Sequence, residues 1–528
     1  MKKIAVSVLA LALLGGAAFA GGSRSGSRQT SRALPPGFSA SGLPIVSQPF
    51  TINVMQVRYR SHGADFMNNG FYAQLAKDTN ITVNWETRYT ADFNEQKGLM
   101  FASGDLPEVI FGSTGFSVED IVNNRELFIP LEDLIDKYMP NLKAIMAQDP
   151  SVRKAVTYPD GHIYSLPSKL PGRPQILDGI FINRVWLEKL GLAVPKTTDE
   201  LYQVLKAFKT RDPNGNGKAD EIPWYIIQNS PSNFQWGSTG LFGATDEWIV
   251  ENGKVIYAPA SEQFRQGLEW FAKLYTEGLI VSEYFTMPSD VYYATGADTS
   301  IQRFGFIMGW TADGDIQGNA KDFMAIEPPA APSGKRYVKP LNEGIRPIEM
   351  MITAKCPHPE VIARWADQFY TPDAAVQNTF GAFGETTRKE ADGSYTVLPL
   401  SATPGFDGLD FRKWNRSPAD CGPGYAPANL KMNMDTSSGD GLKLDLDKHY
   451  VPYLDMSRVM PANAWATVEQ NAEKASLKVA LDNYVVAATA EWISAGRVGS
   501  WDGYLAELKR LNVDRYTAIQ QAIYSANK

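Results

Sequence analysis

The sequence predicts an α/β protein that folds as two lobes. Its 528 residues are too many for one hydrophobic core, since single cores stop growing at about 250–300 residues. Near the beginning of the chain, strand-like and helix-like segments alternate, which predicts a parallel sheet covered by helices. These segments are, in order, residues 51–57, 69–77, 81–85, 93–102 and 108–111. Ligands of such sheets bind beyond the carboxyl ends of the strands, so we expect Arg58-Tyr59 and Gly112-Ser113 near a cleft.

Later parts of the chain continue this mixture of strands and helices. Apolar patterns predict strands at 179–183, 302–310 and 345–354. Apolar residues at helical spacing predict helices at 184–190, from 198, at 261–277, 360–370, 463–495, 502–511 and 514–526. Residues 381–445 show no period and are rich in Gly, Asp, Ser and Pro. We expect this stretch to form a surface excursion or a loop over a cleft.

The first twenty residues have the features of a signal peptide. Lys2-Lys3 precede an apolar run, and Ala18-Phe19-Ala20 forms a cleavage site. Residues 21–46, rich in Gly, Ser, Arg and Pro, predict a flexible leader. No cysteine lies near the cleavage site, so we expect no lipid anchor and place the mature protein in a periplasm.

Composition narrows the classes of partner. Removing the signal peptide takes away two lysines and leaves 49 basic and 58 acidic residues, which argues against nucleic acid. The 12 Trp, 23 Tyr and 25 Phe are plentiful, and we expect some in the core and others in a binding cleft. The two cysteines, Cys356 and Cys421, lack the spacing of a metal site. In an oxidising compartment they either pair or stay reduced, and the sequence leaves both alternatives open.

A ten-residue stretch, 212–221, is rich in oxygen ligands. A hard cation such as Ca²⁺ binds six to eight oxygens at about 2.3–2.6 Å, which a tight loop can supply. The expected ligands are the side chains of Asp212, Asn214, Asn216, Asp220 and Glu221 and the carbonyl of Lys218. Such a filled coordination sphere indicates a structural ion rather than a catalytic one. The alternative is a solvated Asn-Gly turn.

The same stretch resembles an EF-hand loop. Asp212, Asn214, Asn216 and Gly217 occupy its first, third, fifth and sixth positions. Pro223 stands at the twelfth position, where an EF-hand has a glutamate, so Glu221 would take that role two residues early.

Three longer runs carry a resemblance to a known family. They are residues 102–109, residues 160–167 and the joined run 181–223, which contains Phe181-Ile182-Asn183-Arg184-Val185-Trp186, Pro195-Lys196-Thr197-Thr198-Asp199-Glu200 and the cation loop. Together with Trp501-Asp502-Gly503-Tyr504 near the end, they are similar to the extracellular solute-binding proteins of ABC sugar importers. The branch most resembled binds aldouronate or alginate oligosaccharides and contains many lipoproteins. Two departures are the missing lipobox cysteine and Gly381-Ala382-Phe383-Gly384-Glu385, where a Gly-Ile-Glu-Gly-like turn is expected.

The resemblance implies a periplasmic-binding-protein-like fold: two α/β lobes, a hinge and a ligand cleft between them. It implies a structural Ca²⁺ on the loop 212–221, because alginate-binding members hold calcium on a loop of this spacing. We expect an N-terminal lobe of residues 47–165 and 353–450 and a C-terminal lobe of residues 166–352 and 451–528. The resemblance also implies that the protein is a monomer and that it delivers its ligand to a membrane permease.

Sugars present apolar faces and polar edges, so a binder needs aromatic rings and planar hydrogen-bonding groups. The candidate ring residues are Trp310, Trp236 and Trp414, of which Trp310 follows a predicted strand where sugar-binding relatives stack a ring. Arg346 and Arg412 are candidates for holding a uronate carboxylate, and Asp105 and Glu349 for accepting from hydroxyls. For the tryptophans the alternative is a core position, for the arginines a surface salt bridge, and for Asp105 a turn cap.

Two classes of protein fit these sequence features. The first is a non-catalytic periplasmic binding protein that captures an oligosaccharide, including uronate-containing ones, by hinge closure. The second is a calcium-dependent secreted polysaccharide lyase or glycoside hydrolase, since a glycosidase needs only two carboxylates about 5–10 Å apart. The sequence holds no H-E-x-x-H, G-x-S-x-G or Walker motif, and the resemblance favours the binding protein.

Overall fold

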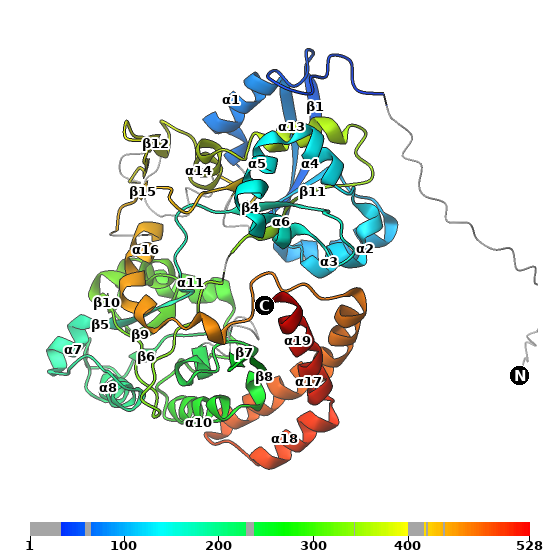
Figure 1. Cartoon of the computed structure of the whole chain (residues 1–528). Helices are drawn as coiled ribbons and strands as arrows, with labels where there is room; N and C mark the ends of the chain where they lie inside the picture. Colours follow the sequence, from blue (N-terminus) through cyan, green and yellow to red (C-terminus); the bar gives the residue numbers. More distant parts are fainter. Residues whose placement is uncertain are drawn as a thin grey trace, which may run out of the picture.

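The computed structural model describes residues 33–58, 65–228, 237–342, 344–399, 417–418, 421–436 and 439–528. The chain forms two lobes, each with its own sheet and hydrophobic core, as Figure 1 shows. The predicted signal peptide and part of the predicted leader lie outside the described residues. Among the residues described, no helix has the length and apolarity needed to cross a membrane.

The first lobe is built on a six-stranded sheet of order β14-β4-β11-β3-β1-β2. Its strands are β1 (Phe50–Arg58), β2 (Ile81–Tyr89), β3 (Val109–Phe111), β4 (Leu166–Lys169), β11 (Arg346–Ile352) and β14 (Gly424–Tyr425). The first three run parallel, as the alternating pattern of the sequence predicted. β11 is antiparallel to β3 and β4, so its amino end lies at the carboxyl edge of β3.

Helices cover both faces of this sheet. They are α1 (Gly70–Thr79), α2 (Thr90–Ser103), α3 (Val118–Asn123), α4 (Glu132–Tyr138), α5 (Pro140–Gln148), α6 (Pro150–Val156), α13 (Pro359–Asp367) and α14 (Pro372–Phe380). The core on one face contains Phe111, Trp365 and Phe369, which meet edge-on or tilted at 4.9–6.1 Å between ring centroids. A small sheet of β12 (Thr387–Lys389), β13 (Tyr395–Val397) and β15 (Met432–Asn433) extends the lobe.

The second lobe is built on a four-stranded sheet of order β10-β5-β9-β6. Its strands are β5 (Gly179–Asn183), β6 (Ile222–Trp224), β9 (Phe304–Gly309) and β10 (Phe323–Ala325), and a separate hairpin joins β7 (Trp248–Glu251) to β8 (Lys254–Tyr257). β9 is antiparallel to β5 and parallel to β6, so Trp310, after β9, lies beside Asp178, before β5.

The helices of the second lobe pack around this sheet and its hairpin. They are α7 (Arg184–Leu190), α8 (Thr198–Thr210), α10 (Glu262–Thr276), α11 (Ser289–Ala297), α12 (Ala312–Ile316), α16 (Gly439–Tyr450), α17 (Val468–Ala495), α18 (Trp501–Arg510) and α19 (Val513–Asn527). The helix predicted at 261–277 is confirmed as α10, and its Phe264, Leu268, Phe271 and Leu274 are fully buried. The long C-terminal helix α17 packs against both α10 and α19.

The lobe boundaries differ from those expected from the sequence. β4 and β11, both expected in the C-terminal lobe, complete the sheet of the first lobe by pairing with each other and with β3. α16, expected in the N-terminal lobe, packs on the second, where the Tyr450 hydroxyl donates to the carbonyl of Ile180 and accepts from its N–H. The reason is tertiary: a strand belongs to the sheet whose edge it pairs with, and residue order along the chain does not decide this.

Two segments that join the lobes run side by side. Ile176 forms a bridge with Pro340, the Leu177 N–H donates to the Lys339 carbonyl, and the Leu341 N–H donates to the Gln175 carbonyl, both at 2.9 Å. A third passage, from residue 434 to 439, includes two residues outside the described part. In Figure 1, α16 lies on one side of these linking segments, and α3 and α19 lie on the other.

The two cysteines form no disulfide with each other in the described structure. Cys356 follows the carboxyl end of β11, whereas Cys421 contacts Thr114 beyond the carboxyl end of β3, with 3.0 Å between Thr114 Oγ1 and Cys421 Sγ. Because β3 and β11 are antiparallel, these positions lie at opposite edges of the sheet.

Candidate functional site

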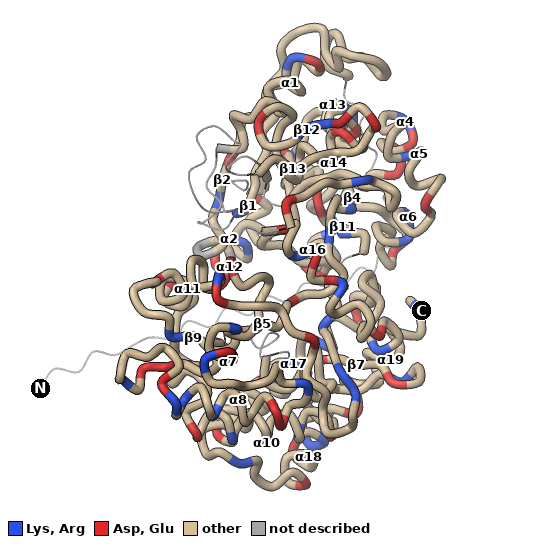
Figure 2. The backbone as a smooth tube through the Cα atoms, turned by 90° about the vertical axis from the view of Figure 1, so that its left-hand side faces the viewer, with Lys and Arg blue, Asp and Glu red and all other residues tan. Residues whose placement is uncertain are grey.

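Trp310 is the centre of a polar cluster in the second lobe. It directly follows β9, and its ring is partly exposed. The guanidinium carbon of Arg173 lies 5.4 Å from its ring centroid, and Nζ of Lys443 lies 4.7 Å from it. Arg173 comes from a segment that links the lobes, and Lys443 from α16. Figure 2 shows α16 beside α12 and β5, on the side of the second lobe that faces the strands of the first.

Lys443 is fully buried, and its ammonium makes no hydrogen bond among the described residues. Burial lowers the pKa of Lys443 to about 8, against the opposing influence of Asp178, Asp447 and Asp315. A buried ammonium without hydrogen bonds is costly, because the charge has lost its water without regaining full solvation from the protein. The face of the Trp310 ring compensates only in part. Lys443 is therefore a donor with unused capacity.

Unused acceptors lie beside this unused donor. Asp315 Oδ2 and Asp313 Oδ1 are buried and accept no hydrogen bond among the described residues. Burial, with Asp178 and Asp313 nearby, raises the pKa of Asp315 well above its usual range. The other carboxylate oxygen of Asp313, Oδ2, accepts from the N–H of Gly439 at 3.2 Å, which ties α12 to the start of α16.

Gly309 allows Asp315 to approach the strand. A Cβ placed on Gly309 would lie 1.8 Å from Asp315 Oδ2, so no other residue fits at this position without displacing the carboxyl group. The result is an aromatic ring surrounded by a donor and acceptors that the protein leaves unsatisfied. This combination matches a ligand with an apolar face and many hydroxyl groups.

The candidate residues of the first lobe form a different kind of arrangement. Glu349 is fully buried; Oε1 lies 2.9 Å from Arg346 Nη2 and accepts from Ser113 Oγ at 2.8 Å, and Oε2 accepts from the Gly422 N–H at 2.9 Å. Arg346 Nη2 also donates to Ser113 Oγ at 2.9 Å. Arg346 and Glu349 thus act on each other and hold the carboxyl edge of β3 against residues 421–422. The salt bridge of Arg346 is therefore with a buried carboxylate rather than on the surface.

Of the remaining predicted ligand residues, only Asp105 lies in the described part of the chain. Asp105 precedes the amino end of β3, at the opposite edge from Ser113, and its side chain is 88% exposed and pairs with Lys355 at 3.0 Å. It is therefore a surface carboxylate away from the other candidates, a correction to the expectation. Trp236, Trp414 and Arg412 lie outside the described residues. Arg58 is the last residue of β1 and Gly112-Ser113 directly follow β3, so these residues lie at the carboxyl edge of the sheet, while Tyr59 lies outside the described residues.

The loop 212–221 is folded around its own side chains. Asp212, at φ 44°, accepts the N–H groups of Gly215 and Asn216 on Oδ1 and that of Gly217 on Oδ2. Asn214 Oδ1 accepts from the Asn216 N–H, and Asn216 Oδ1 from the Lys218 N–H. The side-chain amides of Asn214 and Asn216 donate to Asp220, and the first of these bonds is the main reason why the pKa of Asp220 is lowered.

The environment of the Glu221 carboxylate shows whether this loop could hold a cation. Glu221 is only 3% exposed, and its Oε1 accepts no hydrogen bond among the described residues. Burial raises the pKa of Glu221, and the nearby charges of Asp212 and Asp220 add to this. An orphaned buried carboxylate oxygen beside two other carboxylates fits a hard cation. No three His, Cys, Asp or Glu side chains converge as a metal site in the part of the chain described. The ligand set expected from the sequence also includes the side-chain amides of Asn214 and Asn216 and the backbone carbonyl of Lys218.

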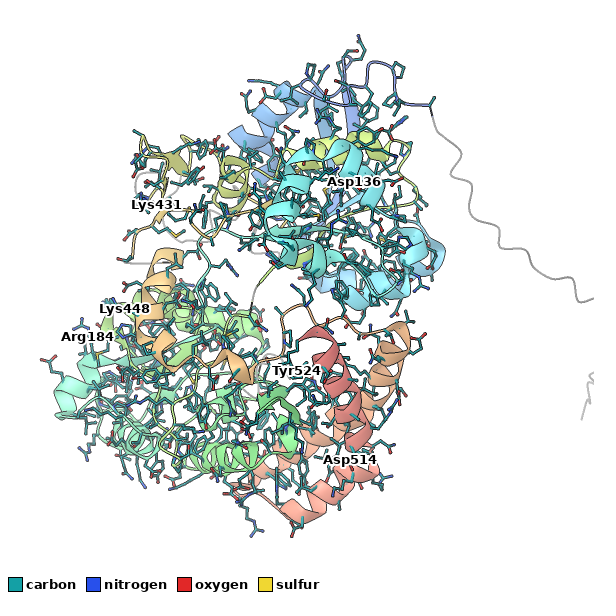
Figure 3. All side chains as sticks on the ribbon, viewed as in Figure 1. Asp136, Arg184, Lys431, Lys448, Asp514 and Tyr524 are labelled. Carbon is teal, nitrogen blue, oxygen red and sulfur yellow. The ribbon has the colours of Figure 1, made fainter. Side chains whose placement is uncertain are left out.

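Sequence reasoning found Trp310 but missed most of its neighbours: Arg173, Asp178, Asp313, Asp315 and Lys443. The lack of a period in residues 381–445 predicts no helix around Lys443, whereas α16 begins at Gly439. A signal was present: Leu442, Leu446 and Tyr450 are spaced by four and share one face of that helix. Figure 3 labels Lys448, near the end of α16, and Lys431 of the first lobe, which lie on the same side of the molecule.

Comparison with known proteins identifies the family to which this chain is similar. The family described as "Bacterial extracellular solute-binding protein" matches residues 61–376. The fructooligosaccharide ABC transporter substrate-binding protein FusA of Streptococcus pneumoniae serotype 4 (strain ATCC BAA-334 / TIGR4) is 34% identical over 481 residues, 86% of this chain and 87% of that protein.

Solved structures agree with this similarity. FusA in complex with kestose and the FusA EF-hand mutant in complex with fructo-nystose each give a TM-score of 0.79 at 33% identity, covering 90% of this chain and 100% of theirs. The alginate-binding protein AlgQ2 without calcium ion gives 0.68 at 25% identity, covering 91% and 98%. The expected periplasmic-binding-protein-like α/β fold is confirmed by these neighbours. The chain belongs to the bacterial extracellular solute-binding protein family.

Proposed function

We propose that this protein captures a neutral oligosaccharide between its two lobes and delivers it to the permease of an ABC transporter. The proposal rests above all on the Trp310 cluster, in which Lys443, Asp313 and Asp315 carry buried polar atoms without a partner among the described residues. Sugar hydroxyls both donate and accept, so one ligand satisfies the ammonium and the carboxyl groups together. The relative that is named as an ABC transporter substrate-binding protein supports the same function.

Within this class we propose fructooligosaccharides as the ligand. FusA, the relative similar over most of both chains, is named for fructooligosaccharides and was solved with kestose and fructo-nystose. The expectation of a uronate is withdrawn, because the comparisons favour a neutral fructan over an acidic glycan. The structure supports this change. Arg346, the described candidate for a uronate carboxylate, already pairs with the buried Glu349 at 2.9 Å.

Isothermal titration calorimetry tests the ligand. We expect kestose and nystose to bind the mature protein, and an alginate trisaccharide of similar size to give no measurable heat. Trp310→Ala should weaken kestose binding by about tenfold or more, because an aromatic stacking partner contributes about 1 kcal/mol or more in addition to its burial. The matched control is Trp501→Ala. Trp501 lies on α18, away from the Trp310 cluster, so this variant should bind kestose as the wild type does. Tight binding of the uronate, or unchanged affinity in Trp310→Ala, would refute the proposal.

A binding protein leaves its ligand intact, and we propose that this chain is not an enzyme. The alternative of a lyase or hydrolase gains no support from relatives, which are named as binding proteins. Incubation of kestose with the purified protein, followed by chromatography of the products, should return kestose alone. Release of fructose at a rate proportional to protein concentration would favour the hydrolase.

We also propose a structural Ca²⁺ on the loop 212–221. Asp212, Asn214, Asn216, Asp220, Glu221 and the Lys218 carbonyl would hold it, and the ion would offset the negative charges of Asp212, Asp220 and Glu221. Support comes from the orphaned Glu221 oxygen and from the EF-hand that FusA is described as having. Calcium at 100 times its Kd should stabilise the fold by about 2.7 kcal/mol, measured as a rise of Tm over the chelator-treated protein.

The proposed setting is a periplasm, in which the protein acts as a monomer after removal of residues 1–20. Support comes from the leader pattern and from membership of the extracellular solute-binding family. Expression of the full chain with its leader, followed by osmotic-shock release and mass spectrometry, should give a mature form that begins at residue 21. Analytical ultracentrifugation should give a single species of monomer mass.

A further inference from the structure

A separate cavity of about 390 Å³ lies where the two lobes and their linking segment meet. Its walls come from α3 of the first lobe, from residues 342–349 and from residues 462–474, which lead into α17 of the second. None of its lining residues belongs to the Trp310 cluster. Figure 1 shows α3 and α19 on the side of the linking segments opposite to α16. The volume is at the lower end of the range of small-molecule sites.

Three asparagines line this cavity. Asn342 Nδ2 donates to the Met460 carbonyl at 2.8 Å and is used by the fold. Asn471, on α17, is 7% exposed, and Asn463 is partly exposed. The side-chain amides of these two residues can each donate to and accept from a polar molecule in the cavity.

The charges that line the cavity compensate one another. Arg346 pairs with Glu349 at 2.9 Å. Lys474 is partly buried, which lowers its pKa, and Glu119 on α3 and Glu247 oppose that effect. A cavity without a surplus of either sign does not select an anion or a cation. A neutral molecule therefore fits its electrostatics.

An aromatic side chain completes the wall. Trp465 lines the cavity and packs on Tyr158 of the first lobe, with 4.4 Å between ring centroids at an interplanar angle of 44°. Its position is fixed further by Asn527, which accepts from the Trp465 N–H and donates to its carbonyl, both at 2.9 Å. A fixed ring beside two amides provides both an apolar face and hydrogen-bonding groups.

We propose that this cavity is a second ligand site and that it takes one neutral sugar ring or a polyol of similar size. Asn471 and Asn463 bind its hydroxyls, and Trp465 contacts its apolar face. The site is distinct from the oligosaccharide site at Trp310. Because its walls come from both lobes, its occupant stabilises the observed arrangement of the lobes, and by linkage the two sites influence each other's affinity.

Ligand-observed NMR with D-fructose tests this site on the full mature protein carrying Trp310→Ala. We expect fructose to bind this protein with a Kd in the millimolar range. Asn471→Leu, which keeps the side-chain size but removes the amide, should weaken that binding at least tenfold. Ala462→Phe, which fills the cavity while leaving every polar group in place, should do the same. Asn68→Leu, at an exposed asparagine of the first lobe, is the matched control and should have no effect.

The oligosaccharide site is measured in parallel, so the two proposals fail separately. Asn471→Leu with an intact Trp310 should still bind kestose within threefold of the wild type, which also shows that the variant is folded. Loss of all fructose binding in Trp310→Ala, or equal fructose binding with and without Asn471→Leu and Ala462→Phe, would overturn the second site. Tighter binding of glucuronate than of fructose would overturn its assignment to a neutral ligand.

Discussion

The ammonium of Lys443 lies 4.7 Å from the ring centroid of Trp310 and makes no hydrogen bond among the described residues. The two side chains come from α16 and from the end of β9, which are distant in sequence. A ligand hydroxyl that accepts from this ammonium regains the hydrogen bonds that burial removed. Lys443 is therefore expected to contribute more to ligand binding than to the stability of the free protein.

Lys443→Met should weaken kestose binding by about 10- to 100-fold, because a hydrogen bond to a charged group contributes about 1.5–3 kcal/mol. Methionine keeps the length and the contact with the ring, so stacking on Trp310 persists. Calorimetry measures the loss, and Lys448→Met, at an exposed lysine of the same helix, is its control. Equal affinity of the two variants would contradict the role given to Lys443.

Lys443 also predicts opposite effects of pH on stability and on binding. Burial lowers its pKa from 10.5 to about 8, so between these values the unfolded chain binds a proton that the folded protein has released. Stability then rises with pH, and the wild type should gain up to about 3 kcal/mol relative to Lys443→Met between pH 7 and 10. Over the same range the wild type should bind kestose more weakly, because the ammonium loses its charge.

Urea unfolding of the wild type and of Lys443→Met, side by side across that range, measures the first effect, and calorimetry measures the second. The difference between the two proteins isolates Lys443 from the tyrosines that titrate at higher pH. Parallel pH profiles for both proteins would show that Lys443 keeps an ordinary pKa.

Glu221→Gln should reverse its effect on stability when calcium is added. Without the ion, the variant should be the more stable protein, because it removes a buried carboxylate whose Oε1 has no partner among the described residues. With calcium, the wild type should be the more stable one, because only it retains all three carboxylates. Differential scanning calorimetry in chelator and in millimolar calcium gives the four Tm values. Asp105→Asn, an exposed carboxylate, should show no such crossing.

Gly309→Ala should destabilise the protein by about 1–3 kcal/mol and reduce kestose affinity as well. The added Cβ would lie 1.8 Å from Asp315 Oδ2, so the carboxyl group has to leave the position that it holds beside Trp310. Gly98→Ala, on an exposed face of α2 with nothing within 4 Å of the new Cβ, should instead stabilise by up to about 1 kcal/mol. Thermal unfolding and calorimetry on both variants check the pair.

Periodicity predicted the individual elements well where each segment carries its own signal. β1, β2 and β3, with the helices between them, follow from alternation and from helical spacing within about ten residues. The loop 212–221 was also predictable as a unit, because its oxygen ligands are neighbours in the chain. Lobe membership was not predictable in this way, since β4 and β11 join the first sheet through pairing with strands far away in sequence.

The sequence by itself determined the α/β class, the order of most helices and strands and the family, and it proposed the aromatic residue at the centre of the candidate site, because these depend on local pattern or on continuous runs of residues. Only the tertiary structure decided which groups surround Trp310. Arg173, Lys443 and Asp315 come from three different elements, and no spacing relates them. Burial then sets their charge states and their unused hydrogen bonds, and burial is a property of packing that arises only when distant segments meet.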